Sequence, residues 1–127
     1  MREKYFIMYF TSKEKQAIQR LIAAMAMADG KIEMSELILN SVVNSKIGIS
    51  TEDVDASNSM DLQQAVTIVK QMTPEEKRLV CAYLGSMLAI DNDIDKKEML
   101  LWTLLTMQCD FPQMTIAEAN SIISNLK

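Results

Sequence analysis

Apolar residues recur along the chain at the spacing of amphipathic helices, and short polar breaks separate these segments. Between residues 12 and 28, apolar side chains lie three and four positions apart, which places them on one face of a helix. The same spacing predicts further helices at residues 34–46, 60–71, 74–90, 96–108 and 115–126, and a short helix that starts at Thr51. Only three glycines and two prolines are present, so long helices fit better than a sheet that needs many turns. The pattern therefore predicts an all-α fold.

The faces that these helices bury follow from the same pattern. The segment 74–90 is apolar on most sides, which indicates a central helix. In the segment 34–46 we expect the buried side to be formed by Leu37, Ile38, Leu39, Val42 and Val43. In the segment 96–108 the corresponding residues are Met99, Leu100, Leu101, Leu104 and Leu105. Both helices are thus expected to turn these side chains toward the core.

The chain contains an internal repeat of one helical unit. A shift of 62 residues aligns residues 11–43 with residues 73–105 without gaps. The identical pairs include Thr11/Thr73, Glu14/Glu76, Met25/Met87, Asp29/Asp91, Ile32/Ile94, Glu36/Glu98 and Leu39/Leu101. A match in both apolar pattern and polar punctuation is typical of a duplicated structural unit. We expect a single domain, 1–127, whose repeat units cover about residues 11–50 and 73–112.

Signals for helix ends support these boundaries. Thr11 in TSKE and Thr73 in TPEE each precede a glutamate by three residues, which is the spacing of a capping box. Pro74 occupies the first helical position, where its missing N–H group is tolerated. Gly48 is expected to end the second helix of the first unit. The polar stretch VDASNS, residues 54–59, is typical of a loop, and we expect it to join the two units.

Composition and charge exclude several functional classes. The net charge of −4 and the lack of a basic stripe argue against nucleic acid as a partner. No apolar run approaches the ~20 residues of a membrane span, and the apolar stretch in REKYFIMYF is too short for a secretory signal. That opening segment is either a first helix or an extended arm. We therefore expect a cytoplasmic protein with no membrane span.

The set of reactive side chains is narrow. The chain has no histidine, which removes Ser-His-Asp and Cys-His catalysis and most zinc sites. Gly30, Gly48 and Gly85 stand too far apart to form a Gly-rich phosphate loop. Cys81 and Cys109 form no CxxC motif and lie within predicted helices, so we expect reduced, packed thiols. These observations favour a protein that is not an enzyme.

Two acidic turns, MADGKIEMSE and AIDNDIDKKE, follow the first helix of each unit. One interpretation is structural. Asp29 and Asp91 can accept hydrogen bonds from amides at the start of the next helix, and Gly30 and Asn92 tolerate a left-handed helix end. Two further pairs have capping-box spacing, Asp95 with Glu98 and, more weakly, Glu33 with Glu36.

The alternative interpretation of the acidic turns is a site for a divalent cation. The second turn places four carboxylates within eight residues, and hard cations prefer such oxygen-rich clusters. A site shared by both turns is a further alternative if the two turns lie close together in space. The candidate ligands are Asp29, Glu36, Asp91, Asp93, Asp95 and Glu98. The pattern does not match an EF-hand, because Lys96 occupies its glycine position and Trp102 that of its bidentate glutamate.

The segments LIAAMAMADGKIEMSE and QMTPEEKRLVCAYLGSMLAIDNDIDKKEMLLWTLL resemble the tellurite-resistance TerB-like domains. That family repeats an apolar helix, the motif A-D-G-x-I, a glutamate four residues later and a second apolar helix, and TPEEK commonly introduces its second copy. The resemblance covers about residues 11–120. The chain departs from the family pattern at Ile90 and Asn92, where alanine and glycine are usual.

The resemblance implies a compact bundle of about seven helices with pseudo-twofold organisation. It also implies a cytoplasmic protein, or a domain of a larger one, that is associated with tellurite and other stress resistance. By position, the repeated acids of the family correspond to Asp29, Glu36, Asp91 and Glu98, and they imply metal binding.

Three functional hypotheses follow from the sequence. The first is a non-catalytic stress-response module that binds another protein and carries a divalent-cation site at its acidic turns. The second is a purely structural adaptor, which binds through YFIMYF and uses the acidic residues as helix caps. The third, a carboxylate-based metal-dependent hydrolase, needs an open coordination position in a cavity. Neither the partner protein nor the oligomeric state follows from the sequence.

Overall fold

The computed structural model describes residues 10–28, 30, 33–90 and 96–126. In these ranges the chain forms helices and no strands, as the sequence predicted. The helices are α1 (Ser12–Ala26), α2 (Met34–Ile47), α3 (Thr51–Ser57), α4 (Leu62–Lys70), α5 (Pro74–Ala89), α6 (Lys96–Cys109) and α7 (Ile116–Ser124). The opening segment 1–9 lies outside the described residues, whereas the adjoining Phe10 is buried, with 7% of its surface exposed.

The predicted helix starts are confirmed at the two repeated threonines. Thr11 Oγ1 accepts a hydrogen bond from the Glu14 N–H group at 3.1 Å, and the Glu14 carboxylate accepts one from the Thr11 N–H group at 2.8 Å. Thr73 and Glu76 form the same two bonds at 3.2 and 2.9 Å. Pro74 stands in the first turn of α5. Two capping boxes therefore begin the two long inner helices, α1 and α5.

The predicted ends of α2 and α6 are also confirmed. Gly48 adopts a left-handed conformation with φ of 83°, and its N–H group donates to the Asn44 carbonyl at 2.9 Å. Asp110 follows α6 with φ of 60°, and the Phe111 N–H group donates to the Thr106 carbonyl at 2.9 Å. Glycine adopts this conformation without strain, and aspartate is among the residues that tolerate it.

The loop prediction for VDASNS is wrong in its first four residues, which form the second half of α3. Ser50 Oγ accepts a hydrogen bond from the Asp53 N–H group at 3.2 Å, and the Asp53 carboxylate accepts one from the Ser50 N–H group at 3.0 Å. This capping box starts the helix, and the Ser57 hydroxyl donates to the Val54 carbonyl near its end. Polar composition therefore concealed a helix that packs on α1.

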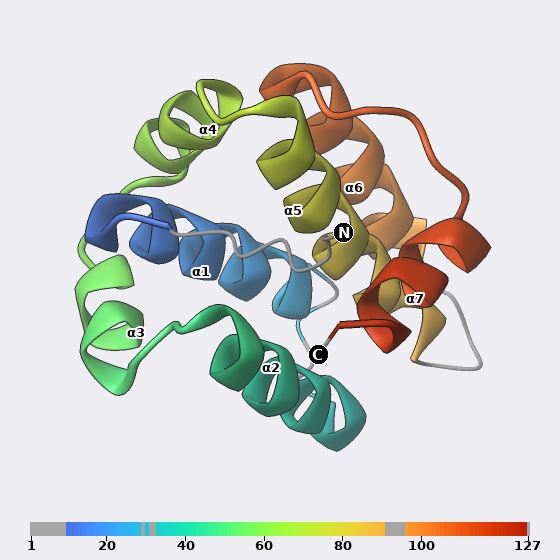
Figure 1. The fold of residues 1–127 in the computed structure, drawn as a ribbon, viewed down its shortest axis with the longest axis horizontal. Helices are drawn as coiled ribbons and strands as arrows, with labels where there is room; N and C mark the ends of the chain where they lie inside the picture. The colour runs from blue at the N-terminus through green and yellow to red at the C-terminus, as the bar shows by residue number, and fades with distance from the viewer. Residues whose placement is uncertain (1–9, 29, 31–32, 91–95, 127) are drawn as a thin grey trace, which may run out of the picture.

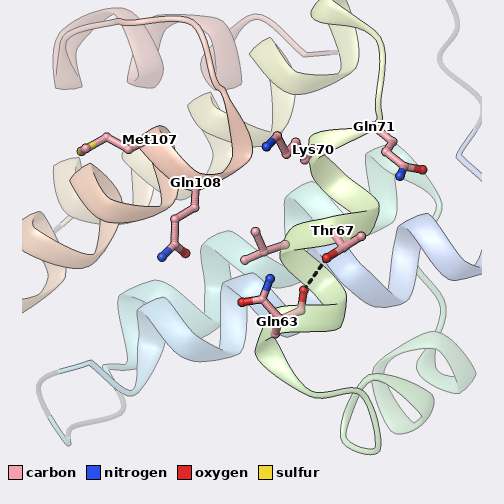
Figure 2. A pocket seen from close by; sticks show the side chains of 7 residues that line it. Gln63, Thr67, Lys70, Gln71, Met107 and Gln108 are labelled. Atoms are coloured by element: carbon pink, nitrogen blue, oxygen red, sulfur yellow. Dashed lines mark hydrogen bonds between the residues drawn. The ribbon is translucent and has the colours of Figure 1, made fainter.

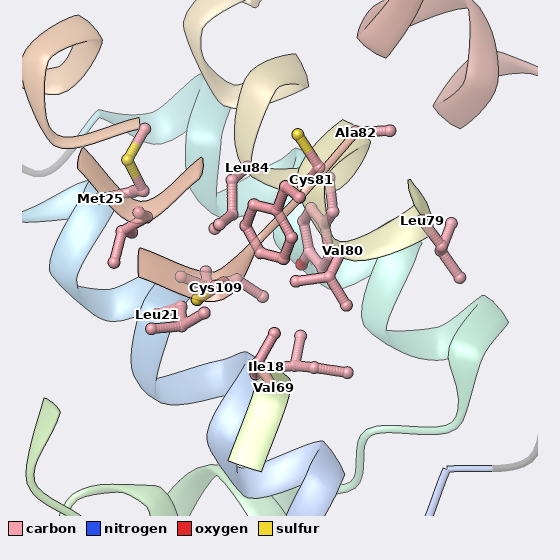
Figure 3. Close-up of a cluster of buried hydrophobic side chains, with 14 of the residues drawn as sticks. Ile18, Leu21, Met25, Val69, Leu79, Val80, Cys81, Ala82, Leu84 and Cys109 are labelled. Atoms are coloured by element: carbon pink, nitrogen blue, oxygen red, sulfur yellow. The ribbon is translucent and has the colours of Figure 1, made fainter. Parts of the chain in front are cut away.

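Helix α5 is central, as its apolar faces predicted. Its residues 79–88 are all buried, and they form the core with apolar residues of the other helices (Figure 3). Helix α1 packs mainly on α4 and α3, and α5 packs mainly on α7 (Figure 1). Helix α2 contacts α5, whereas α6 contacts α1, α4 and α5. None of the helices in the described part of the chain is long and apolar enough to cross a membrane.

The predicted buried side of α2 is largely wrong. Leu37, Ile38 and Val42 are 47, 59 and 48% exposed, and Val43 is the fully buried member of the predicted set. The Tyr83 hydroxyl of α5 donates to Asn44 Oδ1 at 2.7 Å, which turns the Asn44 side of α2 toward the body. The helix is apolar on more than one side, so its sequence pattern left this rotation undecided.

Helix α6 shows the same correction. Leu100 and Leu104 are 59 and 43% exposed, whereas Leu105 is buried as predicted. The indole N–H group of Trp102 donates to the Cys81 carbonyl of α5 at 3.1 Å, so the Trp102 side of α6 faces the core. The outer side of α6 therefore carries leucines that the pattern had assigned to the interior.

Candidate functional site

The structure describes two of the six candidate metal ligands. Glu36 and Glu98 lie in the first turns of α2 and α6 and are only 2 and 4% exposed. A glutamate is seldom buried so completely unless it has a partner. Both carboxylates are therefore buried at the starts of their helices. The other four candidates are Asp29, Asp91, Asp93 and Asp95, and they lie outside the described residues.

The capping interpretation is confirmed in one part and wrong in another. Gly30 has φ of 79°, the left-handed conformation that the first turn predicted. Glu33 precedes α2 as its N-cap, but its side chain makes no capping hydrogen bond. The predicted weaker cap by Glu33 is therefore absent. The predictions for Asn92 and for the pair Asp95–Glu98 involve residues that the structure does not describe.

Where the structure describes the chain, no three Cys, Asp or Glu side chains come together in a way that could hold a metal ion. That search leaves out the four aspartates of the turns, so the cation site stays a prediction.

The two cysteines are free and buried, which confirms the prediction of reduced, packed thiols. Burial raises the pKa of Cys81 and that of Cys109 from 9.0 to about 11. Burial also raises the pKa of the Tyr83 phenol above its usual value. At neutral pH these groups are protonated, so the two thiols are poor nucleophiles.

The exposed apolar side chains of α2 and α6 form two surface stripes. The α2 stripe consists of Met34, Leu37, Ile38 and Val42, and the α6 stripe consists of Leu100, Leu104 and Met107. Ile38 and Leu100 occupy equivalent positions under the shift of 62 residues, as do Val42 and Leu104. Sequence reasoning missed these surfaces, although the consecutive apolar run Leu37–Leu39 cannot all face one side of a helix.

A groove lies between α4 and the C-terminal end of α6 (Figure 2). Its volume is about 470 Å³, and its walls include the buried Val66, the exposed Met107 and the cationic Lys70. The other lining side chains are Gln63, Thr67, Gln71 and Gln108. Amides and hydroxyls both donate and accept hydrogen bonds, so this lining can bind polar groups of either kind.

No model of a known protein family matches the chain, and no curated protein matches it. A solved structure does: the crystal structure of PG1108 from Porphyromonas gingivalis W83, a protein of unknown function, superposes with a TM-score of 0.81. The two sequences are 40% identical, and the match covers 94% of this chain and 100% of the other. This chain belongs to the family of PG1108. Membership in the PG1108 family establishes the fold of the chain and leaves its activity to be inferred from its surfaces.

Proposed function

We propose that this protein is a non-catalytic, TerB-like helical module that binds another protein in a cytoplasmic stress response. The observation that carries the proposal is the pair of apolar stripes on α2 and α6. Seven large apolar side chains in these stripes are 43–74% exposed. Contiguous exposed apolar surface of this kind commonly marks an interaction site.

The proposal includes a pseudo-twofold organisation of two repeat units. Shifted by 62 residues, the bounds of α2 become those of α6, residues 96–109. One pair of contacts agrees with this relation, because α2 contacts α5 while α6 contacts α1. The left-handed residues Gly48 and Asp110 are also 62 positions apart. Duplication would then place one stripe on each unit.

The interaction can be tested by capture of cellular partners on the immobilised protein. The variant Ile38→Ser/Leu100→Ser removes an apolar residue from each stripe, and Ser41→Ala/Thr103→Ala is the matched control on the same helices. We expect the first variant to lose a partner that the control retains, with identical far-UV circular dichroism. A partner retained by both variants would contradict a role for the stripes.

The proposal also includes a divalent cation at the acidic turns. The buried carboxylates of Glu36 and Glu98 support it, because each lies in the first helical turn after one of the two acidic turns of the sequence. Calorimetric titration with Ca²⁺, Mg²⁺, Mn²⁺ and Zn²⁺ tests this part, with Asp91→Asn/Asp93→Asn as the comparison. Binding no tighter than millimolar would leave the structural adaptor, with the acids as helix caps.

A further inference from the structure

We propose that the groove between α4 and α6 binds a short amphipathic segment of a partner protein that carries a carboxylate beside its apolar residues. This inference rests on the proposed interaction function and assigns it a site and a ligand chemistry. The apolar residues of the segment lie on the α6 stripe, and its carboxylate contacts Lys70.

The α6 stripe and the groove form one continuous surface. Leu100, Leu104 and Met107 are spaced four and three residues apart, so they follow one line along the helix. They are 59, 43 and 74% exposed, and Met107 at the end of the line is also part of the groove wall. An apolar helix face laid along this line therefore ends at the groove.

The groove offers polar groups and one cation. Gln63 of α4 and Gln108 of α6 lie on its two sides (Figure 2). The Thr67 hydroxyl donates to the backbone carbonyl of Gln63 at 3.0 Å, so this bond does not involve the Gln63 amide side chain. The volume of about 470 Å³ lies within the range of sites that hold small ligands and side chains.

The charge of Lys70 selects an acidic ligand. No carboxylate lines the groove, and within the described ranges Lys70 forms no ion pair. The neighbouring cation Lys77 is 3.9 Å from Asp110 and is thereby partly neutralised. A segment that places its carboxylate at Lys70 is therefore complementary to the groove in charge.

The test is a selection of random peptides, about a dozen residues long, on the full chain, followed by fluorescence anisotropy with the enriched peptides. We expect peptides with leucine or phenylalanine at helical spacing and a glutamate or aspartate. Lys70→Gln and Leu104→Ser/Met107→Ser should each weaken binding at least about tenfold. Lys13→Gln, an exposed lysine in the first turn of α1, is the matched control and should leave binding unchanged.

Several outcomes would contradict the proposal that the groove binds an acidic, amphipathic segment. They are a selection that enriches no peptide, peptides without an acidic residue, and peptides that bind Lys70→Gln as tightly as the wild type. A wild-type dimer that Leu104→Ser/Met107→Ser dissociates would assign this surface to a second copy of the chain. If peptides bind only after residues 1–9 are deleted, this surface is assigned to the chain's own N-terminus. A cellular partner can be lost by Ile38→Ser/Leu100→Ser and yet be retained by Lys70→Gln. That result would contradict binding in the groove and would still support the proposed interaction function.

Discussion

Gly85 of α5 is a position where the core has no room for a side chain. A Cβ atom there would lie 2.6 Å from the Trp102 ring and 2.8 Å from Ala119 Cβ. The ring cannot move freely, because its N–H group is hydrogen-bonded to the Cys81 carbonyl. Overpacking costs about 1–3 kcal/mol, against about 1 kcal/mol that alanine gains over glycine in a helix. We expect Gly85→Ala to lower the free energy of unfolding in urea by up to about 2 kcal/mol.

The control for Gly85 is Gly30→Ala. A Cβ atom at Gly30 meets nothing within 4 Å, so only its positive φ of 79° resists alanine. Gly30→Ala should also lose stability, by about 1 kcal/mol, because of its left-handed backbone. Only Gly85→Ala should shift the emission of Trp102. An unshifted emission spectrum together with unchanged stability would show that the core around Gly85 is loosely packed.

The buried thiols make stability depend on alkaline pH. An unfolded cysteine loses its proton near pH 9.0, whereas burial raises the pKa of Cys81 and of Cys109 to about 11. The folded state therefore binds more protons between these values, and the free energy of unfolding should fall as pH rises from 9 to 11. Below pH 9 the contribution is fully present. Tyr83 adds a similar decline above pH 10, because burial raises its pKa as well.

The variant Cys81→Ala/Cys109→Ala isolates the thiol contribution. Urea unfolding at pH 8, 9, 10 and 11 should show a shallower decline in the variant than in the wild type, whatever their difference at pH 8. The decline that remains is the contribution of Tyr83, which both proteins keep. Parallel curves for the two proteins would show that the thiols titrate alike in the folded and unfolded chains.

The positions of the helices in the sequence were more predictable than the side that each helix buries. Capping boxes at Thr11 and Thr73 are local, so two residues three positions apart indicated where α1 and α5 begin. Which side of α2 is buried depends on a distant contact, the hydrogen bond from Tyr83 to Asn44. No periodicity within α2 encodes that contact. Sequence reasoning therefore predicted the existence of α2 and misassigned Ile38 and Val42.

A matched pair of truncations tests the observed rotation of α2. Ile38→Ala removes a side chain that is 59% exposed, and Val43→Ala removes one that is 1% exposed. We expect Ile38→Ala to change the free energy of unfolding by no more than about 0.5 kcal/mol. Val43→Ala leaves a cavity and should cost about 2 kcal/mol. Equal losses in urea unfolding would mean that Ile38 is covered in solution.

The candidate site was less predictable than the fold, because a site depends on how several elements meet. The sequence identified Glu36 and Glu98 as repeated acids, and the structure adds that both are buried. The sequence did not indicate the groove, because its lining comes from α4 and α6, two helices that start more than thirty residues apart. The amides and the lysine of that lining have no motif spacing. Their common property is position, which only the packing of the two helices creates.

The sequence predicts two repeat units, about residues 11–50 and 73–112, and helices of these two segments contact each other. We therefore expect the whole chain to unfold in one step. Helix α6 contacts α1, α2 contacts α5, and α1 contacts α5, so the two segments share one core. Thr11→Ala removes a cap in the first unit and should cost about 1 kcal/mol. The chain has a single tryptophan, Trp102, and it lies in the second unit. If the two units unfold together, the fluorescence of Trp102 must report the loss of stability that Thr11→Ala causes.

Urea unfolding of Thr11→Ala should therefore shift the fluorescence of Trp102 and the far-UV circular dichroism to the same lower midpoint. Thr73→Ala removes the equivalent cap of α5 and should produce a shift of similar size in both signals. In a cooperative unit the two losses add, because the two caps share no partner. A Trp102 transition that Thr11→Ala leaves in place, beside a circular dichroism curve that splits in two, would mean that the two units unfold separately.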